Sequence, residues 1–251
     1  MMKKLSTEYI LRRLGALGVS AFTTEEFRRL FRLDAPQAYR ALHRLAARGV
    51  VRRLRHGGYV VVGLGESEAL GQPLFLGTRL VEPSYVAFWS ALHFYGWTEQ
   101  APRVTFVANT RRSGTRRVGH HRFRLVRLAP ARFFGYASAR QGALDFPVAE
   151  PEKAIVDAFY LPDLCGGVEL AAAAAGEAVA AIDLERLEAY AARMGVRTLC
   201  SRLGYVLETL GAEPRSLRRC AATSFVKLDP HGPRRGRFVA RWNVIDNRRG
   251  P

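Results

Sequence analysis

The 251-residue sequence predicts an α+β fold in two parts. Residues 1–63 contain three short amphipathic segments bounded by helix caps and glycines, followed by two apolar segments on either side of a glycine turn. Residues 64–79 are glycine-rich and weakly patterned, which is typical of a linker. Residues 80–251 mix apolar helical segments with alternating strand segments. We therefore expect a small N-terminal domain, a linker, and a larger α+β domain with a helical body and two hairpins.

The first two helices are predicted by their caps. Ser6 can cap a first helix, in which apolar residues recur every three or four positions until Gly18 ends it. Thr23 and Glu26 have the spacing of a capping box, in which each side chain accepts a hydrogen bond from the backbone of the other residue. A second short helix is therefore expected to reach Arg32.

A third helix leads directly into a hairpin. Asp34 is its predicted N-cap, Pro36 is tolerated in the first turn, and Gly49 ends it. Residues 50–62 then read as two short strands around the turn His56-Gly57-Gly58, where glycine permits the positive φ angles of a tight reversal. Three helices followed by a basic hairpin is the element order of a winged helix-turn-helix domain.

Charge is segregated along the chain. The net charge is +17, with 39 Lys and Arg against 22 Asp and Glu. Residues 1–63 hold 13 basic and 4 acidic side chains, residues 103–128 hold 8 and none, and residues 214–251 hold 10 and 2. Residues 129–213 instead hold 7 basic and 12 acidic side chains. A uniform compositional drift toward arginine would raise every segment alike, so the blocks indicate a polyanionic partner.

The third helix and the hairpin supply the predicted contacts with double-stranded DNA. Tyr39 is expected on the buried side of the helix, and the opposite side would enter the major groove. Arginines on that side can reach guanine or phosphate, a glutamine can read adenine, and hairpin arginines can hold flanking phosphates. The predicted DNA-contacting residues are Gln37, Arg40, Ala41, Arg44, Arg52, Arg53, Arg55 and His56.

The second domain is predicted to open with a buried helix and an arginine-rich hairpin. Residues 83–96 are apolar on nearly all sides, which is typical of a buried helix. Residues 103–109 and 122–128 alternate as strands, and residues 110–121 read as a basic loop between them. This hairpin is a candidate further contact with nucleic acid or a protein partner, through Arg111, Arg112, Arg116, Arg117, Arg122 and Arg124.

The remainder reads as helices followed by a last hairpin. Pro151 opens a helix, and Asp183 is a predicted N-cap in the alanine-rich stretch that follows. A further helix is expected over 198–210. The C-terminal stretch is expected to form two strands around the turn at 230–233.

No set of catalytic residues, metal ligands or cofactor-binding residues is evident. Phosphate-loop, HExxH and GxSxG motifs are absent from the sequence, and its three cysteines are widely spaced. Lys153 and Asp157 share one helix face, and an ion pair that orients the helix explains them. An alternative hypothesis places them in a phosphate-transferring enzyme that acts on a nucleotide or a toxin. A second alternative is a module that binds RNA or a toxin through the 103–128 hairpin.

Two longer segments resemble a known family. "YVAFWSALHFYGWTEQAP" (85–102), followed by a strand, and "FPVAEPEKAIVDAFYLP" (146–162), together with the N-terminal winged-helix pattern, look like the AbiEi family of antitoxins and transcriptional regulators. These proteins belong to type IV toxin-antitoxin operons of abortive phage infection. The resemblance implies a repressor that binds inverted repeats in its own promoter, and a C-terminal domain that counteracts a nucleotidyltransferase-type toxin. Whether the two proteins touch is left open.

No apolar run approaches the roughly 20 residues that cross a bilayer, and arginines interrupt the apolar residues near the N-terminus. The sequence therefore predicts a soluble, cytoplasmic protein with no membrane partner.

Overall fold

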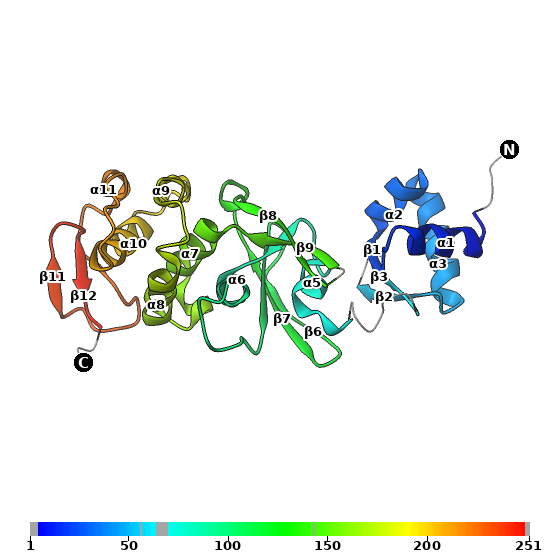
Figure 1. Ribbon diagram of the computed structural model, residues 1–251, viewed down its shortest axis with the longest axis horizontal. Helices are drawn as coiled ribbons and strands as arrows, with labels where there is room; N and C mark the ends of the chain where they lie inside the picture. Colours follow the sequence, from blue (N-terminus) through cyan, green and yellow to red (C-terminus); the bar gives the residue numbers. More distant parts are fainter. Residues whose placement is uncertain (1–4, 56, 64–69, 143, 249–251) are drawn as a thin grey trace.

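A computed structural model describes residues 5–55, 57–63, 70–142 and 144–248. The fold is α+β, as expected, and its parts follow one another along one direction (Figure 1). The N-terminal unit, defined as the described residues up to 63, lies at one end, and a six-stranded sheet occupies the middle. Helices and a small sheet form the other end. Among the described residues, no helix has the length and apolar character needed to span a membrane.

The N-terminal unit contains the three predicted helices and a three-stranded sheet in the order β1-β3-β2. Its elements are α1 (Thr7–Ala16), β1 (Ala21–Thr23), α2 (Thr24–Phe31), α3 (Ala35–Ala47), β2 (Val51–Arg55) and β3 (Gly58–Val61). Strand β1 was not expected, and it pairs antiparallel with β3. The caps at Ser6, Thr23 and Asp34 are all confirmed, the last two as complete capping boxes.

Residues 73–78, inside the stretch expected to be a linker, form helix α5 (Pro73–Thr78). Phe75 is buried in one apolar cluster with Ala21 and Val60 of the N-terminal unit. The opposite side of α5 lies against the central sheet, where a side chain on Gly77 would come within 2.9 Å of Val107. The stretch is therefore packed between the two parts of the molecule, because its few apolar residues are buried on both sides.

The central sheet has the order β6-β7-β5-β4-β9-β8. Its strands are β4 (Ser84–Val86), β5 (Thr105–Asn109), β6 (Gly114–Val118), β7 (His121–Arg127), β8 (Tyr136–Gln141) and β9 (Leu144–Ala149). Strands β5 and β7 run parallel, so the expected hairpin between 103–109 and 122–128 is wrong. The stretch expected to be a basic loop contains β6, which makes the real hairpin with β7.

Two other expectations about the second domain are corrected. Residues 84–86 form the central strand β4, and helix α6 (Phe88–Phe94) begins only afterwards. A short segment that is apolar on all sides suits a buried strand as well as a helix, so periodicity could not separate the two. Strands β8 and β9 were not expected; β8 is an exposed edge strand with few apolar residues, whereas β9 is mostly buried.

The helical body packs beside the sheet (Figure 1). It comprises α7 (Pro151–Tyr160), α8 (Val168–Ala178), α9 (Leu184–Arg193), α10 (Arg197–Thr209) and α11 (Leu217–Cys220), with 3-10 turns η1 (Pro130–Arg132) and η2 (Pro162–Cys165). The openings of α7 at Pro151 and of α9 after the Asp183 cap are confirmed.

The last sheet consists of β10 (Val226–Lys227), β11 (Arg237–Val239) and β12 (Val244–Asp246). The expected hairpin around 230–233 is wrong, because β10 pairs in parallel with β12, and β11 is the antiparallel partner of β12. The Trp242 ring packs closely against α10 at Gly204, where an added side chain would lie only 2.1 Å from the ring.

Candidate nucleic-acid interface

Helix α3 packs through a stripe that differs from the predicted one. Ala38, Ala41, Leu42 and Leu45 are its buried residues. Tyr39, expected inside, is 49% exposed. The positions i, i+3, i+4 and i+7 from residue 38 form a regular helical stripe, and its two alanines let α3 approach its neighbours closely. The outward face is therefore rotated from the prediction, and it presents Tyr39, Arg40 and His43.

These exposed residues border a groove between α3 and the hairpin. The α3 groove, as we call it, has a volume of about 510 Å³ and is lined by Tyr39, Arg40, Leu42, His43, Ala46, Arg53 and Tyr59. No carboxylate is among these lining residues. The Arg40 side chain is exposed and makes no hydrogen bond or ion pair with another described residue. The groove thus combines two arginines with a histidine and two tyrosines.

Three predicted contact residues on α3 have structural roles within the N-terminal unit. Ala41 is 6% exposed and belongs to the core, so its assignment to the DNA-contacting face is wrong. Arg44 is half-buried and donates from Nη2 to the Leu5 carbonyl at 2.8 Å. The side-chain oxygen of Gln37 accepts from the Asp34 amide at 3.1 Å in the capping box.

The predicted hairpin residues divide between the two faces of the small sheet. Arg53 is paired with Tyr59 and borders the α3 groove. Arg52 is paired with Val60, whose side chain contacts the second part of the molecule, so Arg52 lies on the opposite face. The backbone of Arg55 pairs with Gly58, and its side chain and His56 lie outside the described residues.

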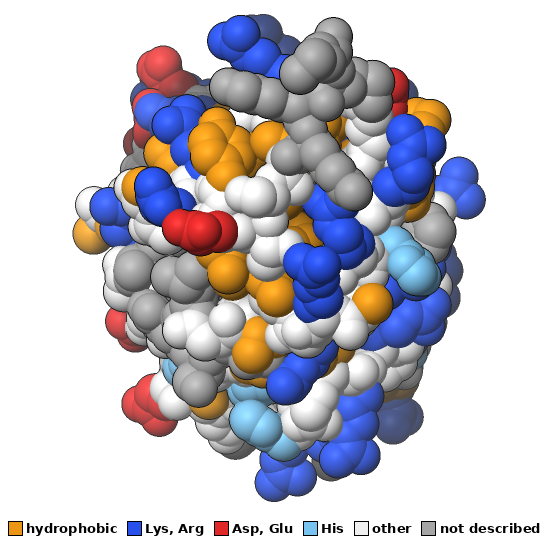
Figure 2. All heavy atoms as spheres, turned by 90° about the vertical axis from the view of Figure 1, so that its right-hand side faces the viewer, with side chains coloured by type: hydrophobic (Ala, Val, Ile, Leu, Met, Phe, Trp, Pro, Cys, Tyr) orange, Lys and Arg blue, Asp and Glu red, His pale blue; other side chains and the backbone are white. Residues whose placement is uncertain are grey.

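The four carboxylates of the N-terminal unit are engaged elsewhere. Glu8 forms an ion pair with Arg12, and Glu25 forms one with Arg28. Glu26 accepts a hydrogen bond from the Thr23 amide and pairs with Arg79. Asp34 accepts a hydrogen bond from the Gln37 amide. Figure 2 views this end of the molecule, where Lys and Arg side chains run down the right-hand part and across the lower end, and acidic side chains lie mostly at the left. None of these four carboxylates lines the α3 groove.

The β6–β7 ribbon, formed by those two strands, is a second basic surface. Arg117 pairs with Arg122, and Thr115 with Arg124, so these four side chains share one face of the sheet. Arg116 lies on the opposite face. Arg122 and Arg124 are exposed and make no hydrogen bond or ion pair with another described residue.

Arg111 and Arg112, also predicted as contacts, reach backbone oxygens nearby. Arg111 donates from Nε to the Glu82 carbonyl at 2.8 Å, and Arg112 donates from Nη2 to the Leu80 carbonyl at 3.4 Å. They hold the loop before β6 against the segment that precedes β4.

Lys153 and Asp157 form a closed network with Tyr85, and all three side chains are fully buried. Lys153 Nζ donates to Asp157 Oδ1 and, at 3.0 Å, to the Tyr85 hydroxyl, which in turn donates to Asp157 Oδ2 at 3.2 Å. Burial raises the pKa of Asp157, although the neighbouring ammonium acts in the opposite sense. Burial also raises the pKa of Tyr85 well above its ordinary value, and the charge of Asp157 adds to this effect. A substrate could reach this network only if the core opened.

The three cysteines are not joined in disulfides. Cys165 and Cys200 are buried and Cys220 is half-buried, and all three are free thiols. Within the part of the chain that the structure describes, no three His, Cys, Asp or Glu side chains are grouped to hold a metal ion.

Comparisons with known proteins define the fold. No family model matches the chain. No curated protein matches it either. Among solved structures, the chain is similar to the crystal structure of the RV2827C protein from Mycobacterium tuberculosis, with a TM-score of 0.54 and 16% sequence identity. The similarity covers 97% of this chain and 92% of that one, so it extends over the whole α+β arrangement.

Proposed function

We propose that this protein is a DNA-binding regulator whose N-terminal unit is a winged helix-turn-helix domain. One observation carries the proposal: the outward face of α3 presents Arg40 beside Arg53 in a groove lined by no carboxylate. Helix α3 would enter the major groove of an operator with inverted repeats, and the β2–β3 hairpin would lie along the neighbouring backbone.

The exposed residues of α3 have suitable chemistry for this role. Arg40 can donate two parallel hydrogen bonds to the edge of a guanine. Tyr39, which was expected on the buried side, and His43, which was not predicted as a contact, can add hydrogen bonds to bases or phosphates from the same helix face. Arg53 would then contact a phosphate and fix the orientation of the domain on the duplex.

We further propose that the protein is the antitoxin of a type IV toxin-antitoxin operon, that it represses this operon, and that its second part counteracts a nucleotidyltransferase-type toxin. The support is the resemblance to the AbiEi family. The two segments that carry it are joined in space, since Val86 pairs with Val148 across the sheet. The Tyr95 hydroxyl also donates to the Ala149 carbonyl at 2.8 Å. The motif residues therefore build one shared core.

The DNA proposal is tested with the duplex that lies upstream of the protein's own gene. We expect Arg40→Ala to weaken binding by about 1 to 3 kcal/mol and to reduce the preference over unrelated DNA. For the wild type, each phosphate contacted should contribute roughly 0.9 to the slope of log affinity against log salt. Fluorescence anisotropy at several salt concentrations measures both quantities.

Arg215→Ala is the matched control, because Arg215 is 85% exposed and lies in the second part of the molecule. It should leave affinity and sequence preference close to those of the wild type. Binding that is absent, insensitive to salt, or equally weakened by both substitutions would contradict the proposal.

The β6–β7 ribbon favours a second candidate function, which is the binding of RNA or of the toxin. Three arginines on one sheet face can stack on unpaired bases or contact phosphates, or they can meet an acidic protein surface. We expect the combined charge reversal Arg117→Glu, Arg122→Glu and Arg124→Glu to abolish neutralisation of the toxin if this ribbon is the contact. Growth of cells that co-express toxin and antitoxin measures the effect.

The matched control reverses three other exposed arginines, Arg218, Arg219 and Arg235, and so changes the net charge equally. If both triple variants neutralise the toxin like the wild type, the ribbon has no part in antitoxicity.

A further inference from the structure

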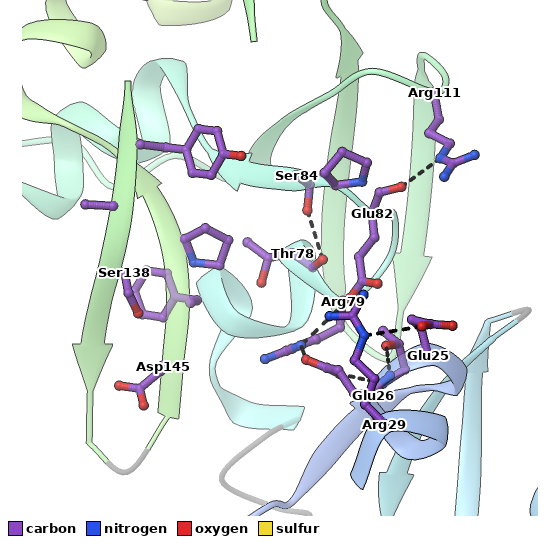
Figure 3. A pocket seen from close by; sticks show the side chains of 16 residues that line it. Glu25, Glu26, Arg29, Thr78, Arg79, Glu82, Ser84, Arg111, Ser138 and Asp145 are labelled. Atoms are coloured by element: carbon purple, nitrogen blue, oxygen red, sulfur yellow. Dashed lines mark hydrogen bonds and ion pairs between the residues drawn. The ribbon is translucent and has the colours of Figure 1, made fainter. Parts of the chain in front are cut away.

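Charged groups at the cavity between the N-terminal unit and the central sheet satisfy one another. This cavity has a volume of about 820 Å³, and Figure 3 shows its arginines beside oxygen atoms of neighbouring glutamates. The pairs are Arg79 with Glu26 at 2.6 Å, Arg29 with Glu25 at 3.3 Å, and Arg111 with the Glu82 carbonyl at 2.8 Å. An anion entering the cavity would have to displace one of these partners, so a cationic surface elsewhere suits a ligand better.

The C-terminal sheet has one face against the helical body and one face that points away from it. Val244 and Asp246 of β12 share the inner face, where Asp246 accepts a hydrogen bond from Tyr205 of α10 at 2.7 Å. Phe238 of β11 pairs with Ile245, the residue between them, so its ring lies on the outer face. Figure 1 shows this sheet at the end of the molecule opposite the N-terminal unit.

The loop after β10 is bonded to the sheet through its backbone carbonyls. Lys227 Nζ donates to the Gly232 carbonyl at 2.8 Å, and Asn247 Nδ2 donates to the Pro233 carbonyl at 2.9 Å. These two bonds fix the residue that follows, Arg234, next to the start of β10.

Phe225, Arg234 and Phe238 form what we call the Phe238 patch. The Phe238 side chain is 59% exposed, the largest exposed fraction among the large apolar side chains that the structure describes. The Phe225 ring meets it edge-on, with centroids 5.1 Å apart and an angle of 74° between the planes. This contact orients the Phe238 ring while most of the side chain stays open to solvent.

The surroundings of these rings are cationic. Arg234 is exposed, and its Nη2 lies 3.5 Å from the Phe225 carbonyl, at the long limit of a hydrogen bond, so the guanidinium keeps donors for an anion. Residues 230–241 contain four arginines and no acidic residue. The carboxylates that flank this segment, Asp229 and Asp246, both accept hydrogen bonds within the fold.

We propose that the Phe238 patch binds single-stranded RNA. A base stacks on the open part of the Phe238 ring, and Arg234 contacts an adjacent phosphate. Bases inside a duplex are already paired and stacked, so an exposed ring favours unpaired bases, which RNA presents in its loops and ends. The patch lies apart from the α3 groove and the β6–β7 ribbon (Figure 1), and the inference does not depend on the proposed contact with DNA.

The test is fluorescence anisotropy on the full chain with three labelled strands of equal length. Octauridylate has bases and phosphates, an abasic strand has the phosphates alone, and octathymidylate is the DNA counterpart. We expect octauridylate to bind about tenfold more tightly than the abasic strand, the difference expected for one stacked base. It should bind at least as tightly as octathymidylate.

Substitutions of exposed residues keep the test independent of folding. Phe238→Leu should weaken octauridylate about tenfold and leave the abasic strand unchanged, whereas Phe238→Trp should retain binding because it keeps an aromatic face. Arg234→Ala should weaken both strands and lower the slope of log affinity against log salt by about 0.7. Arg140→Ala, which removes an arginine that is 69% exposed on β8, is the matched control and should change neither strand.

Arg40→Ala separates this site from the α3 groove, since it should leave octauridylate binding unchanged whether or not it weakens the binding of duplex DNA. The proposal is overturned if octauridylate and the abasic strand bind equally, if octathymidylate binds more tightly than octauridylate, or if Phe238→Leu binds octauridylate as Arg140→Ala does.

Discussion

Lys153 shows how much of this molecule depends on single side chains. Its ammonium is fully buried beside Asp157, and it also lies 5.1 Å from the centroid of the Phe134 ring and 5.5 Å from that of Tyr85. Gly135 approaches it so closely that an added side chain would lie 3.2 Å from Lys153 Cβ. A charge in such surroundings is retained only because the carboxylate, the hydroxyl and the aromatic faces all offset its lost hydration.

Lys153→Met should therefore cost about 3 to 5 kcal/mol of stability, because it removes the only cation that the structure places beside the buried Asp157 carboxyl group. The double variant Lys153→Met with Asp157→Leu should recover much of this loss, since an apolar pair needs no hydration. Thermal unfolding measures both. If the double variant folds like the wild type but no longer neutralises the toxin, the pair has a chemical role. That result would support the alternative hypothesis of a phosphate-transferring enzyme.

Whole elements depend on residues that link them, and the C-terminal sheet is the clearest case. Tyr205 on α10 donates from its hydroxyl to Asp246 Oδ2 on β12 at 2.7 Å, and Arg248 contacts both oxygens of the same carboxylate. The hydrogen bonds from Arg248, with that from Tyr205, lower the pKa of Asp246 to about 2. This one carboxylate thus ties the sheet to the helical body.

Asp246→Asn should lower stability at neutral pH by about 1 to 2 kcal/mol, after allowance for partial exposure of the site. Because the folded pKa lies below the unfolded value near 3.9, this stability is present above that value and is lost as the pH falls toward 2. The difference between wild type and variant should therefore shrink across that window in denaturant titrations. Asp145→Asn, whose partner Arg140 is exposed, should have a much smaller effect at every pH. Equal effects of the two variants would show that the Asp246 contacts do not stabilise the sheet.

At the scale of the whole molecule, α5 connects the N-terminal unit to the central sheet. Phe75 is 3% exposed and shares a cluster with Ala21 and Val60 on one side and the sheet core on the other. Arg79, at the end of the same helix, binds Glu26 of α2 at 2.6 Å. The orientation of α3 relative to the β6–β7 ribbon is therefore set by packing as well as by chain connectivity.

Phe75→Ala should lower stability by about 3 to 5 kcal/mol and separate the unfolding of the N-terminal unit from that of the remainder. Differential scanning calorimetry should show one transition for the wild type and two for the variant. Phe238→Ala provides the control, because this ring is 59% exposed and its loss should cost no more than about 0.5 kcal/mol. Two transitions in the wild type would mean that α5 does not couple the parts.

The sequence by itself determined the features whose partners are near neighbours in the chain. The caps at Ser6, Thr23 and Asp34 bond to residues three positions away, so local spacing was enough to place them. The α+β class follows from the alternation of such local patterns, and the charge blocks follow from the order of the residues along the chain.

The tertiary structure decided everything that depends on distant partners. Strand β7 lies between β6 and β5 in the sheet, and it pairs in parallel with β5. No periodicity in the sequence encodes this strand order or its register. The face of α3 that is exposed depends on which residues its neighbours bury, and Arg44 bonds to Leu5, 39 positions away. Local patterns placed the helix starts whose caps bond within a few residues, whereas packing free energy between remote residues decides which surfaces remain for a partner.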